Sequence, residues 1–486
     1  MRKLWTLVGV LCTCCTVATA AQPESWPQFR GANAAGTVAV EHPLPEEIGP
    51  EQNVIWKVEL PAGHSSPIVY GDQIFVTAAR KVGEKEAQLL TIGLDRKTGK
   101  VQWEALAPHD RLEDIHRIGS YAQPSPATDG ERVVSFFGSS GLLCYSIDGK
   151  LLWKQEMGPF KNDFGAGSSP IISGDCVILC QDHDTNSFLA AFDKRTGKQL
   201  WKTDRSEFAR NYCTPVIWEV DGQKQIVLAA TLRVVGYDFN TGKELWTVRG
   251  ISRVVCMTPV LGDGLLFVAG WAAGGDAGGE RIQFDPFDDV VAEFDKNKNG
   301  SFEEEELPEG PVQQRFSQCD RDKDKLISRL EYENFRALFD KSQNLVGAIQ
   351  PGGKGDVSET HLLWKNTRFV PFCASPLFYK GRLFTVKDGG ILSSLDARTG
   401  KASKTARVPG TGDYYSSPVA GDGKIYLLNE EGKLTVVSAD PEWEVLSTSD
   451  FGDSVYSTPA IVDGRIYLRT TKHLFCFGKS TETAGK

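Results

Sequence analysis

The stretch Asp193-Lys-Arg-Thr-Gly-Lys-Gln-Leu-Trp201 decides the fold, because the same phrase returns along the chain. Full copies run over Asp95–Trp103 and Asp238–Trp246. A shortened copy spans Asp148–Trp153, and an altered copy from Asp396 carries Lys404 where the tryptophan should stand. A phrase that recurs about every 45 residues indicates one supersecondary unit built many times.

A second marker, Ser or Thr followed by Pro at the start of an apolar run, counts the units. Its prolines are Pro67, Pro126, Pro170, Pro215, Pro259, Pro376, Pro418 and Pro459. The spacing stays between 41 and 59 residues except for 117 residues between the fifth and sixth prolines. The sequence therefore predicts eight units and one large insertion after the fifth.

Each unit reads as short β-strands: the run from Pro67 to Thr77 is two strands around a Gly-Asp turn. A four-stranded unit of this size cannot bury both faces alone, so we expect an all-β, eight-bladed β-propeller with the tryptophans between blades. The eighth unit ends at Phe477 without a tryptophan strand, whereas Asn53–Leu60 looks like such a strand without a blade. We expect this N-terminal strand to close the ring.

These repeats resemble the pyrroloquinoline quinone (PQQ) repeat propellers, the group that holds the quinoprotein alcohol dehydrogenases and the outer-membrane assembly lipoprotein of the BamB type. The resemblance covers residues 53–283 and 343–480. The repeat motif is strong evidence for the propeller architecture and weak evidence for a catalytic activity or a cofactor.

Both ends of the chain lie outside the expected propeller, which spans 21–283 and 343–480. Residues 1–20 have a basic start, an apolar stretch and small residues before Ala21, as a cleavable signal peptide does. We expect a periplasmic or secreted protein, with lipid anchoring less favoured, and no transmembrane segment after cleavage. Residues 481–486 are expected to form a disordered tail.

Composition narrows the partners and the role of the cysteines. The chain is 41% hydrophobic with a formal net charge of −9 and has no basic stripe, so nucleic acid is excluded as an expected partner. Cys213, Cys256 and Cys373 precede the prolines of blades 4, 5 and 6 and can approach one another near the channel. The favoured interpretation is that they are buried small hydrophobes.

The insertion carries the sharpest chemistry, because Asp295–Glu306 fits the EF-hand calcium loop at every diagnostic position. The expected ligands are Asp295, Asn297, Asn299, the backbone carbonyl of Ser301, and Glu306 with two oxygens. Calcium is a hard cation that takes six to eight oxygens, which this set supplies. Gly300 permits the sharp turn at the sixth position.

A second loop follows 25 residues later with one departure from the pattern. Its expected ligands are Asp320, Asp322, Asp324, the carbonyl of Leu326, and Glu331. Lys325 replaces the glycine of the sixth position, and a left-handed backbone there costs about 1–2 kcal/mol. We nevertheless predict calcium at this loop, which offers more carboxylates than the first.

The position of the insertion within its blade predicts where it lies. We expect residues 284–342 to form an EF-hand pair with its own small apolar core and short strand contact between Phe302 and Ile327. The blade breaks off after Trp271 and resumes at Leu345. The insertion thus fills the connection between the second and third strands and should overhang the rim that carries the links between blades.

Those links supply the rim with polar and aromatic side chains. They are His64, Tyr121, Gln123, Asn162, Asp163, Arg210, Tyr212, Arg253, Arg368, Asp413, Tyr415 and Tyr456. Arginines from neighbouring blades favour an anionic group, and tyrosines suit a flat ring or a sugar. We therefore expect a binding site for a protein or a small anionic or sugar ligand at this rim.

Two function classes remain open. The first, which we favour, is an exported, monomeric, noncatalytic binding or scaffold protein with Ca²⁺ in its EF-hands. The alternative is a PQQ- and calcium-dependent quinoprotein oxidoreductase. Dehydrogenases of the group typically place a disulfide of adjacent cysteines against the quinone, and residues 21–486 contain no Cys-Cys pair. No catalytic residue is assigned, and PQQ is possible but not favoured.

Overall fold

A computed structural model describes residues 24–479 except 39, 84–85, 110–111, 163, 184–185, 276–281 and 322–323. The expected signal peptide and C-terminal tail lie outside the described residues. Within the described part of the chain, no helix has the length and apolar character needed to cross a membrane.

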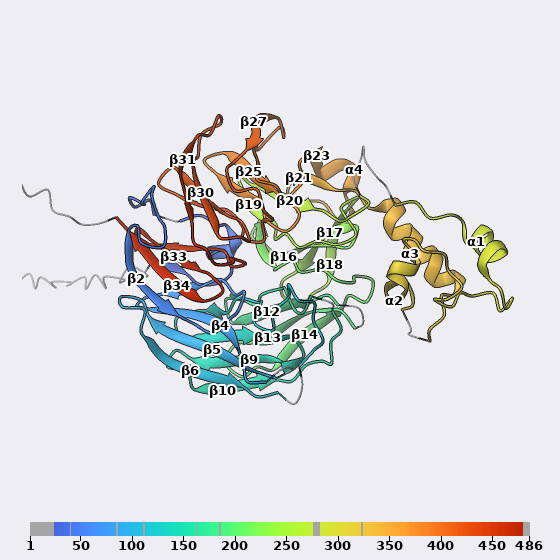
Figure 1. Cartoon of the computed structure of the whole chain (residues 1–486), viewed down its shortest axis with the longest axis horizontal. Coiled ribbons are helices and arrows are strands. Elements are labelled where there is room, and N and C mark those ends of the chain that lie inside the picture. The colour runs from blue at the N-terminus through green and yellow to red at the C-terminus, as the bar shows by residue number, and fades with distance from the viewer. Residues whose placement is uncertain are drawn as a thin grey trace, which may run out of the picture.

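Eight β-sheets follow one another along the chain and are numbered here as blades (Figure 1). Blade 1 contains β3 (Ile68–Tyr70), β4 (Gln73–Lys81), β5 (Ala87–Asp95) and β6 (Val101–Ala107), with β1 (Ser25–Trp26) added beside β3. Blade 2 contains β7 (Ala127–Thr128), β8 (Arg132–Phe136), β9 (Leu142–Ser146) and β10 (Leu151–Gln155). Blade 3 contains β11 (Ile171–Ser173), β12 (Cys176–Gln181), β13 (Phe188–Asp193) and β14 (Gln199–Asp204). Blade 4 contains β15 (Val216–Val220), β16 (Gln223–Ala230), β17 (Arg233–Asp238) and β18 (Glu244–Arg249), with β22 (Gly355–Asp356) added in parallel to β18.

The remaining blades complete the ring. Blade 5 contains β19 (Val260–Gly262), β20 (Leu265–Gly270), β21 (Leu345–Ile349) and β23 (Leu362–Asn366). Blade 6 contains β24 (Leu377–Tyr379), β25 (Arg382–Lys387), β26 (Ile391–Asp396) and β27 (Ala402–Arg407). Blade 7 contains β28 (Val419–Gly421), β29 (Lys424–Leu428), β30 (Lys433–Ser438) and β31 (Val445–Asp450). Blade 8 contains β32 (Ala460–Val462), β33 (Arg465–Arg469), β34 (His473–Gly478) and, from the N-terminal part of the chain, β2 (Val54–Glu59).

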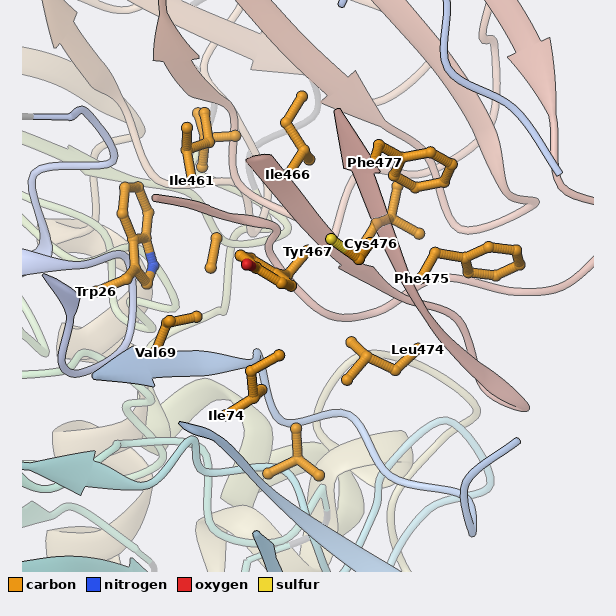
Figure 2. Packing of buried hydrophobic residues seen from close by; sticks show 14 of the residues in the cluster. Trp26, Val69, Ile74, Ile461, Ile466, Tyr467, Leu474, Phe475, Cys476 and Phe477 are labelled. Atoms are coloured by element: carbon orange, nitrogen blue, oxygen red, sulfur yellow. The ribbon is translucent and has the colours of Figure 1, made fainter. Parts of the chain in front are cut away.

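The eight-bladed propeller and its closure by the N-terminal strand are both confirmed. Strand β2 pairs antiparallel with β34 and places Trp56 opposite Cys476. Apolar side chains of blades 1 and 8 meet in one buried cluster at this closure, including Val69, Ile74, Tyr467 and Phe475 (Figure 2). The first and last parts of the propeller therefore share one core.

Tryptophans of the recurring phrase, or on the equivalent strand, join one blade to the next. Trp246, in a full copy, is an exception, because its indole donates to the Gln225 side chain within blade 4 at 2.7 Å. The Trp56 indole donates a hydrogen bond to the Arg96 carbonyl at 3.1 Å and covers Gly99, which has a φ of +73°. A Cβ at Gly99 would lie only 2.5 Å from the indole, so glycine is required there. The same packing recurs for Trp103 on Gly149, Trp153 on Gly197, Trp201 on Gly242 and Trp364 on Gly400.

The altered copy of the phrase keeps this contact by other means. Lys404 stands at the tryptophan position, and its Nζ donates to the Trp443 carbonyl of the next blade at 2.6 Å. The ammonium also lies 4.3 Å from the centroid of the Trp443 ring, a cation–π contact. Blade 6 thus joins blade 7 without a tryptophan of its own at this place.

An N-terminal segment that the repeats did not reveal, residues 24–38, lies across the central channel. The first strands of successive blades contact one another and so surround the channel. The Asn33 side chain makes two 2.8 Å hydrogen bonds with the backbone of Ile217 in blade 4. Arg30 donates to the Pro376 carbonyl of blade 6 at 2.8 Å, and Thr37 bridges to Ala420 of blade 7.

Between β20 and β21 the chain leaves the propeller and forms the short helices α1 (Phe287–Phe294), α2 (Phe316–Cys319) and α3 (Arg329–Lys341). Figure 1 shows them beside the ring, near β17 and β18. A 3-10 turn, η3 (Gln313–Arg315), precedes α2; two others, η1 (Ala32–Ala34) and η2 (Gly138–Ser140), and the short helix α4 (Ser358–His361) lie elsewhere. The apolar residues of the helices form a separate buried cluster around Phe302, as expected.

Candidate binding pocket at the channel mouth and candidate calcium loops

The Ser/Thr-Pro markers meet in a closed ring of hydrogen bonds around the channel, which we call the hydroxyl ring. In each blade the backbone N–H of the marker Ser or Thr donates to the hydroxyl oxygen of the marker residue in the next blade. The bonds run from Ser66 to Ser125 (2.9 Å), Ser169 (2.9 Å), Thr214 (3.1 Å), Thr258 (3.2 Å), Ser375 (3.0 Å), Ser417 (3.0 Å), Thr458 (3.0 Å) and back to Ser66 (2.9 Å). Each buried N–H is thereby satisfied by the neighbouring blade.

A cavity of about 440 Å³, the channel pocket, opens above this ring. All eight residues of the hydroxyl ring line it, together with Phe29 of the segment that crosses the channel. The pocket is therefore a blind hollow rather than a passage. Its size is in the range of small-molecule sites.

Three guanidinium groups line the pocket, those of Arg210, Arg253 and Arg315. Burial lowers the pKa of Arg253 to about 10, and the charges of Arg315 and Arg210 add to the effect. None of the described lining residues is Asp or Glu. Because like charges held together are repelled, the arrangement favours a ligand that brings negative charge.

Aromatic rings also line the pocket. His64 stacks on Tyr456 with ring centroids 4.1 Å apart, and Tyr415 lies 5.5 Å from Tyr456. Burial lowers the pKa of His64 to about 4, with Arg469 as a second cause, so this imidazole is neutral at pH 7. Trp271 and Phe372 add a further edge-to-face pair at 4.6 Å. Flat, uncharged rings and guanidiniums thus line the same pocket.

The structure brings together part of the predicted rim. The pocket collects His64, Gln123, Arg210, Tyr212, Arg253, Tyr415 and Tyr456. Asn162 stands behind it and accepts a hydrogen bond from Tyr212 at 2.7 Å, while Asp163 lies outside the described residues. Tyr121, Arg368 and Asp413 do not line the pocket. The expectation that Arg368 belongs to the cationic group was wrong: Arg315, from the insertion, is the third arginine.

Two of the three channel cysteines meet in the pocket wall. Cys256 and Cys373 both line the pocket, and a hydrogen bond between their side chains is the first cause, before burial, that raises the pKa of the Cys373 thiol. Both are free thiols, as are the other six cysteines of the described chain. Cys213 is buried, and burial raises its pKa to about 12. The less favoured alternative, approach near the channel, thus holds for Cys256 and Cys373, whereas Cys213 is buried as the favoured interpretation predicted.

The first candidate calcium loop is folded around its own polar groups. Asp295 accepts hydrogen bonds from the backbone N–H of Asn299 at 3.2 Å and Gly300 at 2.8 Å. The Asn297 and Asn299 side-chain oxygens accept from backbone N–H groups within the loop, the latter from Ser301 at 2.8 Å. The Glu306 carboxylate accepts from Lys296 at 3.0 Å across the loop. The predicted ligand side chains therefore sit on one tight turn.

The second candidate loop is described apart from Asp322 and Lys323, which lie outside the described residues. Lys325 has a φ of +70°, so the left-handed backbone expected at this sixth position is present. Glu331 accepts from the Arg321 N–H at 2.8 Å and forms a capping box with Ser328 at the start of α3. Asp324 accepts from the N–H of Leu326 at 2.8 Å.

Phe302 and Ile327 join the two loops, as predicted, by reciprocal backbone hydrogen bonds of 3.1 and 2.8 Å. Calcium at either loop stays a prediction.

Comparison with known proteins assigns the propeller. The family model described as outer membrane protein assembly factor BamB matches residues 49–157, 94–270 and 356–483. The chain belongs to this family. The matched ranges of the BamB family model leave out residues 271–355, which contain the three helices of the insertion. No curated protein matches the chain.

Solved structures agree on the fold. BamB from Moraxella catarrhalis superposes with a TM-score of 0.54 at 11% identity, covering 87% of this chain and 99% of that chain. Quinohemoprotein alcohol dehydrogenase from Pseudomonas putida gives a TM-score of 0.56 at 12% identity, covering 94% of this chain and 80% of the other. The corresponding enzyme from Comamonas testosteroni gives 0.53 at 13% identity, covering 95% and 82%. At these identities the likeness shows the fold alone.

The alternative expected from the sequence, PQQ with calcium, can be compared with the lining of the channel pocket. The three arginines suit the carboxylates of PQQ, and the aromatic wall suits its rings. Calcium beside the quinone needs hard oxygen ligands, of which carboxylates are the strongest. The described lining residues include hydroxyl and amide oxygens but no carboxylate. Asp388 and Asp413 act on Cys373 electrostatically but do not line the pocket. The donor set fits an organic anion better than a quinone–calcium pair.

Proposed function

We propose that this BamB-family protein is an exported, noncatalytic binding protein whose channel pocket holds a small anionic ligand with a flat ring. The observation that carries the proposal is the buried Arg253 guanidinium, which lies beside Arg210 and Arg315 in the pocket wall and whose Nε has no hydrogen-bond partner among the described residues. An anion neutralises the repulsion among Arg210, Arg253 and Arg315, and the aromatic wall accepts the ring. A neutral sugar would bring no negative charge to Arg253.

The alternative, a PQQ- and calcium-dependent oxidoreductase, shares the ligand class but differs in its metal. It requires calcium ligands beside the quinone, which the chemistry of the lining does not favour. A third role, protein scaffolding, is suggested by the family's assembly factors, and it places the partner on the outer surface rather than inside a blind pocket. A pocket ligand therefore separates the first role from the third.

Binding of an aromatic polyanion tests the pocket. We expect naphthalenetrisulfonate to bind the purified mature protein by calorimetry, and Arg253→Gln to weaken binding at least about tenfold, because a charge-assisted hydrogen bond contributes roughly 1.5–3 kcal/mol. Arg368→Gln, which changes an arginine outside the pocket, serves as the matched control and should bind as the wild type does. PQQ, added with calcium and an alcohol, should give no dye reduction. Absence of any polyanion binding would contradict the proposal.

We also propose that the insertion binds Ca²⁺ at the two loops and is an EF-hand pair. The support is the full ligand pattern of the first loop together with the left-handed backbone at Gly300 and Lys325. Calorimetry should show calcium binding with a dissociation constant of about 10⁻⁵ to 10⁻³ M, the range of sensor and extracellular modules. Glu306→Gln should remove most of the heat from the first loop, whereas Glu304→Gln, a non-ligand in the same loop, should not. Silence at millimolar calcium would exclude the metal.

A further inference from the structure

The insertion contributes directly to the channel pocket. Arg315 ends η3 and Gln318 lies in α2, and both line the pocket with residues of the ring. All other described lining residues come from the propeller or from the N-terminal segment. A segment outside the repeats therefore supplies one wall of the pocket.

The helices of the insertion are held against the ring on the side of Arg253. The Arg253 guanidinium lies 4.3 Å from the centroid of the Phe339 ring in α3, and its backbone N–H donates to Ser342 Oγ at 3.0 Å. Arg321 donates to the Ser206 carbonyl of the ring at 3.1 Å. These contacts fix α2 and α3 relative to the arginines of the pocket.

A second cavity, of about 340 Å³, lies between the insertion and blades 4 and 5. Its lining includes Arg210 and Arg253 from the ring and Asp320 and Glu331 from the second loop. Gln318 lines both cavities. Two acids of the second loop and two arginines of the channel pocket therefore line one cavity.

The insertion carries an excess of negative charge next to the arginines of the pocket. Residues 285–340 carry 16 acids and 8 bases, a net charge of −8 beside the arginines of the pocket. Asp320 and Glu331 share the second cavity with Arg210 and Arg253, so their negative charge competes with a ligand anion for these guanidiniums. Calcium bound at the second loop would neutralise part of that charge.

We propose that calcium binding by the insertion and anion binding in the channel pocket are coupled, with Arg315 and Gln318 as the residues through which the insertion acts on the ligand. The inference rests on the proposed function and adds its regulation. Coupling between two sites is reciprocal, so the anion must raise the affinity for calcium by the same factor as calcium raises the affinity for the anion.

The test measures naphthalenetrisulfonate binding to the full mature chain in calcium and in chelator at equal ionic strength. We expect calcium to tighten binding roughly 5- to 100-fold, the usual range of coupling between sites. Arg315→Gln should weaken binding in calcium and shrink the calcium effect. Arg336→Gln removes another arginine of the insertion, which lies outside both calcium loops and pairs with Glu333, and should leave both unchanged. Both variants should melt as the wild type does.

The outcomes separate the inference from the proposed function. Equal affinity in calcium and chelator, or an Arg315→Gln protein with an unchanged calcium effect, would overturn the coupling while leaving the anion site in place. Failure of the wild type to bind the trisulfonate in either condition would overturn both. A calcium titration with saturating trisulfonate provides the reciprocal check, and a calcium affinity that does not rise contradicts the coupling.

Discussion

At the residue scale, the surroundings of Asp388, a largely buried acid near the pocket, change its pKa. Burial raises its pKa to about 6, and Asp413 and Glu430 contribute further. Its carboxylate accepts a 2.8 Å hydrogen bond from the Tyr414 N–H, which acts in the opposite direction. Since the folded pKa exceeds the ordinary value of 3.8, the folded chain favours the protonated acid. That contribution to stability is present below pH 3.8 and is lost as the pH rises through about 6.

Near pH 8, Asp388→Asn should therefore be more stable than the wild type by roughly 1–2 kcal/mol of unfolding free energy, after allowing for partial exposure. Near pH 4 the two proteins should be equally stable. Asparagine keeps the acceptor for Tyr414, so the change isolates the charge. Urea unfolding at the two pH values gives the comparison. A stability difference that is the same at both pH values would show that the carboxylate charge is not the cause.

At the scale of elements, the hydroxyl ring explains why a Ser or Thr precedes every marker proline. Thr214 is buried and accepts the Ser169 N–H at 3.1 Å, so a change of its hydroxyl affects two blades at once. Thr214→Val keeps the shape and leaves a buried N–H without its acceptor, which should cost about 1–3 kcal/mol. Thr448→Val, on an exposed strand position, is the control and should change stability by less than about 0.5 kcal/mol. Denaturant unfolding of both variants measures these changes. Equally small losses of unfolding free energy for the two variants would mean that the hydrogen bonds of the hydroxyl ring do not stabilise the fold.

The repeats predicted the strands and the closure, since tryptophan and turn glycine recur at fixed spacing and act locally between neighbours. They did not predict the segment 24–38, because it contains no repeat and its contacts, such as Asn33 with Ile217, join residues far apart in sequence. The marker spacing signalled eight equivalent positions without indicating that their hydroxyls bond in a circle. Arg315 was missed for the same reason: only the folded chain brings a helix of the insertion to the arginines of blades 4 and 5.

At the scale of the whole molecule, the N-terminal part of the propeller chain has two roles: it closes the ring and it crosses the channel. Strand β2 completes blade 8, and the preceding segment crosses the channel and contributes Phe29 to the pocket. The ring and the ligand site therefore depend on the same stretch of chain. Loss of that stretch should remove both a blade edge and the base of the pocket.

Trp56→Ala tests the closure with the least disturbance. The indole packs on Gly99 of blade 1 and lies 6.1 Å from the Tyr467 ring of blade 8, so it joins the first blade to the last. Truncating a fully buried tryptophan costs about 3–5 kcal/mol, and the partial exposure of Trp56 lowers the expected loss of unfolding free energy to about 2–3 kcal/mol. Ile55→Ala on the same strand, 46% exposed, should cost less than about 1 kcal/mol. Thermal and denaturant unfolding of both variants gives the comparison. If both lost the same small amount of unfolding free energy, the Trp56 side chain would not hold the closing strand. The backbone pairing of β2 with β34, which either substitution leaves in place, would then be what holds it.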